Sequence, residues 1–410
     1  MTYVKSLRCV ECGREYPIGP LYVCDFCFGP LEVMYDYDSV KKNMTKHLIE
    51  SRPHHMWRYR ELLPIDGDPI TGFETGFTPL MRARNLAKIW GVKAIFFKDD
   101  SVNHPTLSFK DRVVAVAITK AKEFGFSTVA CASTGNLANS VAAQSARAGM
   151  NCFIFTPSDL ELSKTINSLI YHPTLVRIDG NYDDVNRLCS EITSKHHWAF
   201  VNINIRPFYG EGSKSLGFEI AEQLEWTTPQ SIVVPCAGGS LLTKIWKSFK
   251  ELEKIGLVPP VTTKVFAAQA EGCSPITTAI KEGSDIIKPV RPKTIAKSLA
   301  IGNPADGYYA AKIAKDTGGF GADSSDQEIV DAIKLLAETE GIFAETAGGV
   351  TISAAAKLVK SGMIAKDETL VICITGNGLK TPDAVVNHLP KPIPIKPNIE
   401  AFEDLLRKIG

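Results

Sequence analysis

Short apolar runs alternate with segments of helical periodicity along most of the chain, starting near residue 94. The runs 94–98, 128–131 and 152–155 have the length and composition of strands. The segments 112–125 and 136–149 carry apolar residues at helical spacing and end at a glycine, which is typical of a helix C-terminus. This alternation predicts parallel sheets with helices on both faces.

The same alternation continues toward the C-terminus. A break is expected at 205–212, and the Pro-rich stretch 388–397 ends the domain before a closing helix at 398–409. Further strands and helices are expected, in chain order, at 175–178, 200–202, 213–224, 232–234, 240–255, 265–268 and 370–374. In sheets of this kind, ligands bind at the carboxyl ends of the strands.

Composition and charge exclude several classes of protein. Hydrophobic residues make up 44% of the chain, charged residues 22%, and the formal net charge is +1. Nothing in this balance favours nucleic acid or an anionic membrane. No apolar run approaches a membrane span, and residues 1–30 lack the apolar core of a signal peptide. We therefore expect a cytoplasmic protein whose ten cysteines are thiols or metal ligands.

Three small-residue turns follow predicted strands, and a lysine precedes them. Lys110 lies in Ser108-Phe109-Lys110-Asp111-Arg112, where partial burial would make its amine usable for a Schiff base. The turns are Ser133-Thr134-Gly135-Asn136, Ala237-Gly238-Gly239-Ser240 and Thr375-Gly376-Asn377-Gly378-Leu379-Lys380. Helix N-termini and backbone N–H groups in such turns suit a carboxylate and a phosphate. Pyridoxal phosphate is the cofactor that combines an aldehyde for the lysine, a ring, and a phosphate for such a turn.

Each of these features also has an ordinary structural interpretation. Lys110 could be a solvated residue at a helix start, and the Ser-Thr-Gly-Asn turn could be a plain helix cap. The two glycine-rich turns could simply pack on the sheet. Other chemistries have less support, because Gly376-x-Gly378 lacks the third glycine of a dinucleotide fingerprint. Neither a Walker loop nor a His-Glu-x-x-His zinc motif is present.

Four N-terminal cysteines have the spacing of a zinc ribbon, Cys9-x2-Cys12-x11-Cys24-x2-Cys27. Two such pairs close a tetrahedral site, which predicts a structural Zn²⁺; the alternative is a degenerate ribbon that folds without metal. A nucleic-acid-binding ribbon should be basic. Here the acidic side chains outnumber the basic ones, namely Lys5, Arg8 and Arg14 against Glu11, Glu15, Asp25, Glu32, Asp36 and Asp38. A structural or dimer-contact role is expected instead.

Taken together, the motifs resemble threonine synthase, a family of pyridoxal-phosphate enzymes with the tryptophan-synthase-β fold (fold type II). Some members of that family also begin with a similar ribbon. The Ser-Thr-Gly-Asn element is common to the fold group, whereas Ser-Phe-Lys-Asp and Thr-Gly-x-Gly-Leu-Lys are closer to threonine synthase. The matching stretches run in family order from about residue 70 to 385, and include Thr78-Pro79-Leu80, 104–112, 132–136, Glu211-Gly212-Ser213-Lys214, 234–239 and 375–380.

The resemblance implies a role for each matched position. Lys110 would hold the cofactor through a Schiff base and, once released, would move protons at Cα, Cβ and Cγ. The implied substrate is O-phospho-L-homoserine, which with water would give L-threonine and phosphate. Asn136 would bind the ring hydroxyl, Thr375 the ring nitrogen, Ala237, Gly238, Gly239 and Ser240 the cofactor phosphate, and Ser133 and Thr134 the substrate carboxylate.

Two departures from the family pattern affect the substrate more than the cofactor. Leu107 replaces the usual glycine before Ser-Phe-Lys-Asp, and Tyr209 falls at the expected phosphate-binding arginine. We therefore hypothesise that Arg206 and Asn204 bind the substrate phosphate, because a guanidinium suits phosphate. The alternatives are a β-replacement or elimination enzyme, similar to cysteate synthase or to a threonine/serine dehydratase, and a zinc-ribbon interaction protein with an inactive body.

The expected architecture is α/β, with two doubly wound domains, mostly parallel sheets and a small N-terminal appendage. The larger domain should bind the cofactor, and the chain should act on a small molecule as a homodimer without nucleic-acid or membrane partners. The predicted parts are a zinc-ribbon-like segment at 1–35, a larger domain at 36–112 plus 206–390, a smaller domain at 113–205 and a tail helix at 391–410.

Overall fold

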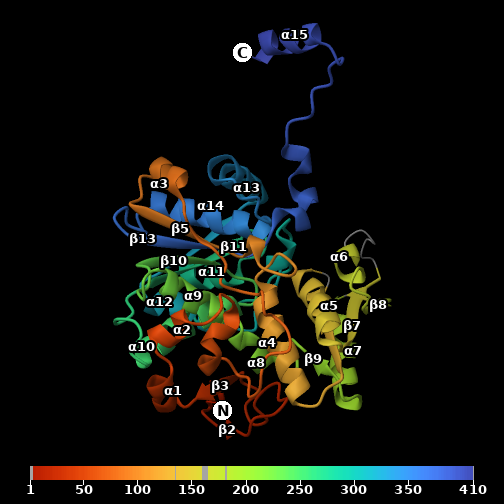
Figure 1. Cartoon of the computed structure of the whole chain (residues 1–410), viewed down its shortest axis with the longest axis vertical. Helices are drawn as coiled ribbons and strands as arrows, with labels where there is room; N and C mark the ends of the chain where they lie inside the picture. Colours follow the sequence, from red (N-terminus) through yellow and green to blue (C-terminus); the bar gives the residue numbers. More distant parts are fainter. Residues whose placement is uncertain (1–2, 134, 159–164, 181, 410) are drawn as a thin grey trace.

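The computed structural model describes residues 3–133, 135–158, 165–180 and 182–409 (Figure 1). Two mostly parallel sheets stand side by side in it, and a small antiparallel sheet lies at the N-terminus. This arrangement confirms the predicted α/β class with two wound sheets and an appendage.

The larger sheet has the strand order β12-β11-β10-β13-β5-β4. Its neighbouring strands pair in parallel, except that β4 runs antiparallel to β5 at one edge. Because β5, β10 and β13 end at the same edge, the segments that follow them are brought together there. The strands are β4 (Leu80–Arg82), β5 (Ala94–Asp99), β10 (Ser231–Pro235), β11 (Lys264–Ala270), β12 (Gly321–Ser324) and β13 (Thr369–Ile374).

Helices cover both faces of the larger sheet, as the alternation predicts. Alternate strand residues divide between two apolar cores: Val234 and Val371 face α10 and α12, whereas Val233 and Ile372 face α13 and α14. The helices of this part of the chain are α3 (Arg84–Trp90), α8 (Arg206–Glu211), α9 (Lys214–Gln223), α10 (Ser240–Lys254), α11 (Pro275–Glu282), α12 (Gly307–Asp316), α13 (Asp326–Glu340) and α14 (Thr346–Lys360).

The smaller sheet has the order β8-β7-β6-β9 and is parallel throughout. Val129 and Ile154 pack toward α5, while Ala130 and Phe155 pack toward α7, so this sheet is also covered on both faces. Helix α4 lies between the two sheets (Figure 1). The elements are α4 (Lys110–Glu123), β6 (Thr128–Ala132), α5 (Asn136–Ala148), β7 (Asn151–Pro157), α6 (Ile166–Leu169), β8 (Thr174–Ile178), α7 (Tyr182–Lys195) and β9 (Ala199–Phe200).

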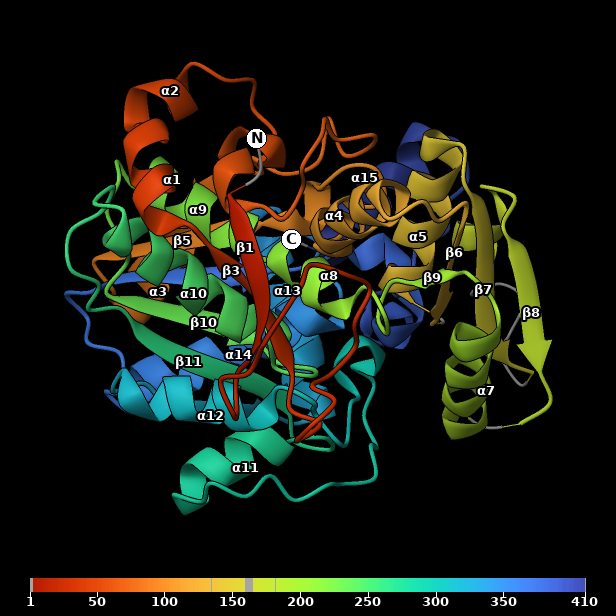
Figure 2. The same cartoon turned by 90° about the horizontal axis from the view of Figure 1, so that it is seen from below.

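The N-terminal sheet, of order β2-β1-β3, lies across the body in front of α8 and α10 (Figure 2). Its strands are β1 (Val4–Cys9), β2 (Glu15–Tyr16) and β3 (Leu31–Tyr35), and helices α1 (Tyr37–Asn43) and α2 (Lys46–Glu50) follow. Leu7 and Val33 share one apolar core with residues of α4, α9 and α10, such as Val113, Phe218 and Phe249. The appendage is therefore packed into the body.

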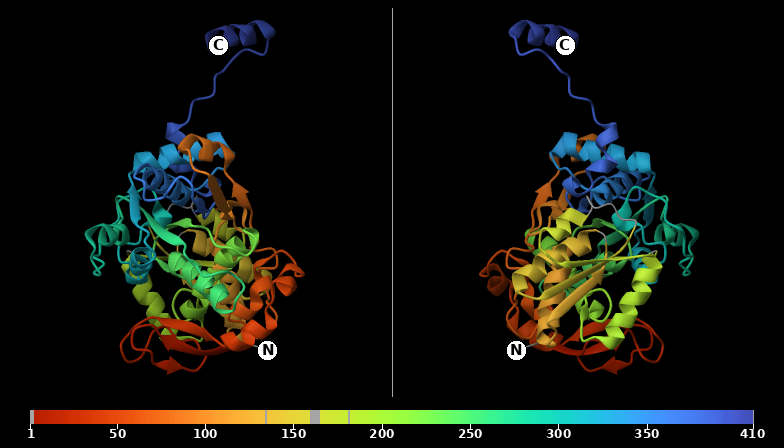
Figure 3. Two further views of the ribbon diagram at one scale, coloured as in Figure 1. Left: turned by 90° about the vertical axis from the view of Figure 1, so that its left-hand side faces the viewer. Right: turned by 90° about the vertical axis from the view of Figure 1, so that its right-hand side faces the viewer.

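The last helix, α15 (Ile399–Ile409), stands clear of the rest of the chain (Figures 1 and 3). It follows a segment with prolines at 390, 392, 394 and 397. Elsewhere the predicted elements agree with the structure to within about two residues at most boundaries, but the expected break at 205–212 is wrong, because helix α8 occupies most of it. No helix in the described part of the chain combines the length and the apolar character that a membrane crossing requires.

Candidate active site

Lys110 is the first residue of α4, at the edge where the strands of the larger sheet end. Its side chain is half-buried, and the ring of Phe109 lies 4.9 Å from Nζ. The amine hydrogen-bonds to the Tyr209 hydroxyl at 3.2 Å. No carboxylate in the described residues lies within ion-pair distance of this amine. The lysine therefore lies in a partly apolar setting with a neutral partner, which suits Schiff-base chemistry.

The two residues after Lys110 fix the start of α4. The Asp111 carboxylate accepts hydrogen bonds from Thr106 N and Oγ1 at 2.9 and 2.8 Å, and from Ser140 Oγ at 2.7 Å. Arg112 is fully buried and pairs with Asp100 at 2.7 Å and with Glu219 at 2.5 Å. These contacts explain why Asp and Arg follow the lysine in the motif, because they fix the backbone that carries Lys110.

The loop after β13 lies directly against the Lys110 segment. Phe109 N donates to Thr375 O at 2.9 Å, Asn377 N donates to Leu107 O at 3.1 Å, and Ser108 bridges to Gly376. Thr375 is buried, and its hydroxyl has no hydrogen-bond partner in the described part of the chain. A free hydroxyl beside Lys110 fits the predicted partner of a ring nitrogen.

Asn136 begins α5 and reaches across to Glu345, which precedes α14. Its Nδ2 donates to both carboxylate oxygens of Glu345, at 3.2 and 2.9 Å. Glu345 N in turn donates to Gly376 O at 2.9 Å, so this pair joins the Thr375 loop. Burial raises the pKa of Glu345, against the opposing effects of Asn136, Lys380 and Lys110.

Ser133 and the start of α5 face the same edge of the smaller sheet. Gly135 is the N-cap of this 13-residue helix, and no side chain among the described residues caps it. Ser133 Oγ accepts a hydrogen bond from Gly135 N at 3.3 Å. The uncapped helix end and the nearby hydroxyl can bind a carboxylate. Thr134, the other predicted carboxylate ligand, lies outside the described residues.

The turn 237–240 leads from β10 into α10. The N–H groups of Ala237, Gly238 and Gly239 have no hydrogen-bond partner in the described residues, and no side chain caps α10. Gly239 has φ +94°, and a Cβ there would lie 2.7 Å from Asp306 O, so only glycine fits. Three free N–H groups at the start of a 15-residue helix make a cradle that can accept a phosphate.

Of the two predicted ligands of the substrate phosphate, only Arg206 lies near this cradle. Its guanidinium pairs with Asp306 at 2.9 Å, and Asp306 N donates to Gly238 O at 2.9 Å. Asn204 is used within its own loop, where its Oδ1 accepts from Phe200 N and its Nδ2 donates to Trp198 O, at 2.8 and 3.0 Å. Both groups thus have partners within the protein.

The two departures from the family pattern have clear structural settings. Leu107 adopts φ +58°, the left-handed conformation that favours glycine, and its side chain is exposed. The loop therefore keeps a glycine-like backbone despite the leucine. Tyr209 lies on α8 and directs its hydroxyl at Lys110. The sequence indicates both positions, but the Lys110–Tyr209 pairing depends on residues 99 apart.

Two residues of the site are not predicted from the sequence. Glu345 binds Asn136, and Asp306 binds both Arg206 and the 237–240 turn. A lone acidic residue carries no local signal. Glu345 does occur just before a segment of small residues, Ala347-Gly348-Gly349, which was the available hint of close packing.

The four N-terminal cysteines come together as predicted. Their sulfur atoms all lie within 4.8 Å of one another, with Cys9–Cys27 at 3.4 Å and Cys12–Cys24 at 3.7 Å. Sulfurs bound tetrahedrally at 2.3 Å from zinc would be about 3.8 Å apart, so the thiols fit such an ion. Burial opposes ionisation of Cys24, yet hydrogen bonds from the Tyr16 hydroxyl and from backbone N–H groups lower its pKa to about 6.

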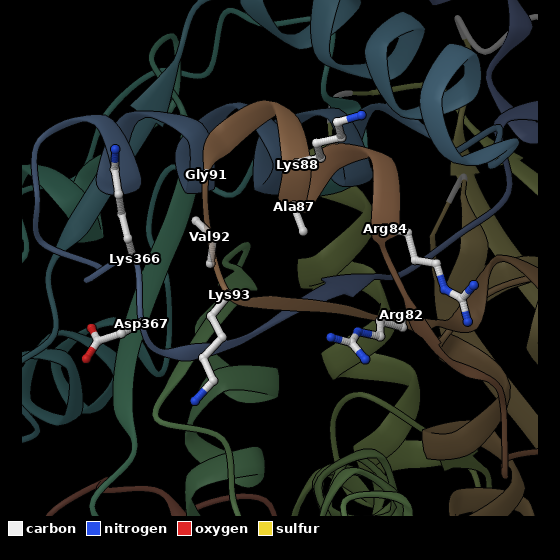
Figure 4. Close-up of a pocket in the computed structure, with 9 residues that line it drawn as sticks. All are labelled: Arg82, Arg84, Ala87, Lys88, Gly91, Val92, Lys93, Lys366 and Asp367. Carbon is white, nitrogen blue, oxygen red and sulfur yellow. The ribbon is translucent and has the colours of Figure 1, made fainter.

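A cavity of about 710 Å³ lies at the opposite ends of β5 and β13, away from Lys110 (Figure 4). Its lining includes Arg82, Lys88, Lys93 and Lys366. Figure 4 shows Lys88 and Lys366 extending upward and Lys93 extending downward, so the charges do not converge on one point. The cavity is therefore not part of the candidate active site.

Comparison with known proteins identifies the family and the fold. Residues 73–376 match the family model described as pyridoxal-phosphate dependent enzyme, and residues 8–32 match a model described as NinF protein. The structure is similar to maize serine racemase, with a TM-score of 0.61 at 19% identity over 81% of this chain and 92% of that one. It is also similar to an O-ureido-L-serine synthase, with a TM-score of 0.63 at 16% identity over 81% and 97%. These two likenesses show the fold.

Curated relatives carry a more specific name. A threonine synthase of Methanocaldococcus jannaschii is 37% identical over 98% of this chain and 99% of its own length. A threonine synthase of Methanosarcina acetivorans is 38% identical over 98% of each chain. A threonine synthase of Halalkalibacterium halodurans is 37% identical over 85% of this chain and 96% of its own. The chain belongs to the pyridoxal-phosphate dependent enzymes and, among them, to the threonine synthase family.

Proposed function

We propose that this protein converts O-phospho-L-homoserine and water to L-threonine and phosphate, with pyridoxal phosphate as its cofactor. The observation that carries the proposal is identity to threonine synthases over almost the whole chain, including both sides of the Lys110 crevice. The site chemistry supports it, because a partly buried lysine, a phosphate cradle and a free hydroxyl converge at one edge of the sheet.

The cofactor fits the residues that line this edge. Lys110 would bind its aldehyde carbon, the N–H groups of 237–240 its phosphate, and Thr375 its ring nitrogen. Asn136 would bind the ring hydroxyl, which requires its amide to share or exchange the hydrogen bond to Glu345. When bound, the cofactor supplies the electron-withdrawing ring that stabilises negative charge on the substrate carbons.

The protein's own groups then bind the substrate and move its protons. Ser133 and the uncapped start of α5 would hold the carboxylate. Lys110, freed from the cofactor, would take and return protons at Cα, Cβ and Cγ, since its released amine would stay beside the bound substrate. Departure of phosphate from Cγ and addition of water at Cβ complete the change from substrate to threonine.

Arg206 is our proposal for the substrate-phosphate ligand. A guanidinium binds phosphate through two parallel hydrogen bonds, and Arg206 lies beside the 237–240 turn. To do so it must release or share Asp306. Asn204 has a weaker claim, because its amide is used within its own loop.

This arrangement keeps a second function open, a β-replacement or elimination on a related amino acid. The observation in its favour is that the Arg206 guanidinium already has a carboxylate partner and that Tyr209 replaces the expected arginine. An enzyme without a strong phosphate ligand would act on substrates that lack this phosphate or carry it elsewhere.

One assay separates the two functions. The purified, cofactor-loaded protein is given O-phospho-L-homoserine, and phosphate and threonine are measured together. Equal release of both supports the first function. Absence of turnover while the cofactor absorption band is present would refute it and direct the test to O-phosphoserine with sulfite, and then to threonine.

We further propose a structural Zn²⁺ held by Cys9, Cys12, Cys24 and Cys27. The separations of the four sulfur atoms support this proposal. Metal analysis of the purified protein should give one zinc per chain. A Cys12→Ser, Cys27→Ser variant should have none.

We also propose a cytoplasmic homodimer. The support lies in α15, whose Ile399, Phe402, Leu406 and Ile409 are exposed although they recur at helical spacing. An 11-residue helix is too short to be stable alone. A second copy of the chain that packs on this apolar face would explain why the helix forms. Light scattering of the intact chain and of a chain that ends at residue 390 tests this proposal. The intact chain should have the mass of a dimer, and a monomer mass for both chains would refute it.

A further inference from the structure

The hydroxyl of Tyr209 is the one side-chain group in the described part of the chain within hydrogen-bond distance of Lys110 Nζ, at 3.2 Å. We propose that Tyr209 is a positioning residue, which holds the amine of Lys110 for proton transfer and takes no part in binding the substrate phosphate. This inference rests on the proposed role of Lys110. It assigns a function to a position where the family pattern predicts a phosphate ligand.

The chemistry of a phenol suits this task. The Lys110 amine must exist both as an ammonium, which only donates, and as a free amine, which also accepts. A tyrosine hydroxyl can accept from the first and donate to the second, so the hydrogen bond persists through both states. An arginine at this position has donors alone and would repel the ammonium. The replacement of arginine by tyrosine therefore changes which group residue 209 can bind.

Helix α8 is held firmly, so the hydroxyl has a fixed place. Glu211 is fully buried and binds Lys214 at 2.6 Å, Lys244 at 2.8 Å and the Tyr35 hydroxyl at 2.8 Å. On the other side, a Cβ at Gly212 would lie 2.6 Å from Arg112 O, so α8 packs against the backbone of α4. These contacts tie Tyr209 to the helix that carries Lys110.

The remaining groups around the amine do not replace the hydroxyl. The Phe109 ring lies 4.9 Å and the Tyr209 ring 5.8 Å from Nζ, and both offer only their faces. The charge of Lys110 is felt at Glu345, but the carboxylate of Glu345 is bound by Asn136. Removing the hydroxyl of Tyr209 alone should thus leave the amine without a directional partner.

The test compares Tyr209→Phe, Tyr209→Arg and the wild type in two measurements. Tyr22→Phe is the matched control, because Tyr22 is an exposed tyrosine of the appendage. The first measurement is the rate at which the cofactor-free protein captures pyridoxal phosphate, followed by absorbance. It needs no substrate, so it remains informative even if O-phospho-L-homoserine is not turned over. The second is the kcat and KM of the loaded enzyme.

We expect Tyr209→Phe to capture the cofactor about tenfold more slowly, the value of one lost hydrogen bond. Its kcat should fall about 10²-fold, the lower range for a proton-transfer group, with KM changed less than about twofold. Tyr209→Arg should be impaired at least as much. Tyr22→Phe should match the wild type in both measurements.

Two results would overturn the proposal. One is a Tyr209→Phe protein with wild-type capture rate and kcat. The other is a raised KM at unchanged kcat with recovery of the low KM in Tyr209→Arg, which would place residue 209 in the phosphate subsite. Failure of the wild type itself to release threonine, with slower capture still seen in Tyr209→Phe, would refute the proposed substrate and leave the Lys110–Tyr209 pair intact.

Discussion

Two neighbouring regions at the start of α4 hold their lysines in opposite ways. In the charge layer formed by Lys98, Asp100, Arg112 and Glu219, every charge is fully buried and faces an opposite one, with Lys98–Glu219 at 2.6 Å. In the crevice, Lys110 has a phenol as its neighbour and no carboxylate within ion-pair distance in the described residues. The Lys98 amine is held by Glu219 and by hydrogen bonds to Thr78 O and Gln223, although burial lowers its pKa. The Lys110 amine is half-buried and makes one hydrogen bond to a neutral group, so it is the amine that a ligand in the crevice can reach.

The charge layer and the crevice are structurally connected through α4. Arg112 belongs to the layer and Lys110 to the crevice, and they are two residues apart at the start of α4. The fixed charges thus hold the helix end from which the reactive amine projects. Changes in the layer should reduce stability, whereas changes in the crevice should reduce activity.

The largest effect is expected for Lys110→Ala. Loss of the cofactor-binding and proton-transferring amine should lower threonine formation by about 10⁴-fold. The free energy of unfolding should change little, because Lys110 makes no ion pair with any described residue. Activity assays and urea unfolding measure the two quantities. Lys122→Ala, an exposed lysine on the same helix, is the control and should behave as wild type.

Glu219→Gln should reduce stability more than it reduces activity. It removes a carboxylate that faces both Arg112 and Lys98, so it leaves buried positive charge uncompensated. We expect a loss of about 3–5 kcal/mol in the free energy of unfolding. Urea unfolding measures it, with the exposed Glu191→Gln as control. A loss below about 1 kcal/mol, the level of a surface pair, would contradict the account of the layer.

The layer also predicts how stability depends on pH. Burial alone would raise the pKa of Glu219, but Arg112 and Lys98 hold it at about 2. The pKa in an unfolded chain is about 4.3. Because the folded pKa is the lower one, this contribution is present above about pH 4.3 and is lost as pH falls toward 2. Unfolding midpoints between pH 5 and 3 should fall less steeply for Glu219→Gln than for the wild type.

Arg206→Ala should give the smallest of these effects. If its guanidinium binds the substrate phosphate, loss of one charge-assisted contact of about 1.5–3 kcal/mol should raise KM for the phosphorylated substrate about tenfold or more. The kcat should change less than KM does. An unchanged KM would show that the Arg206–Asp306 pair serves only to hold the 237–240 turn.

The strands and their following turns were predictable because their signals are local. The runs at 94–98, 232–234 and 370–374 are the cores of β5, β10 and β13, and the rule that ligands bind at strand ends locates the crevice. The helix α8 was missed because Pro207, Gly210 and Gly212 read as loop residues. Proline is accepted in the first turn of a helix, and the two glycines permit close contact with α10 and α4.

The rest of the site depends on contacts that no local pattern encodes. Glu345 meets Asn136 across 209 residues, and Tyr209 meets Lys110 across 99. The sequence indicates that position 209 is unusual, but the partner of its hydroxyl follows only from the packing of α8 on α4. Substrate preference is hardest to predict from sequence for the same reason, since Asp306 and a substrate phosphate would compete for the Arg206 guanidinium.

The most direct test of the contrast between the two regions is to find which lysine carries the cofactor. The loaded protein is reduced with borohydride, digested and mapped by mass spectrometry. We predict that the reduced cofactor is attached to Lys110 alone, while Lys98 and Lys214, each paired with carboxylates, are unmodified. Attachment to another lysine, or to none, would contradict the account.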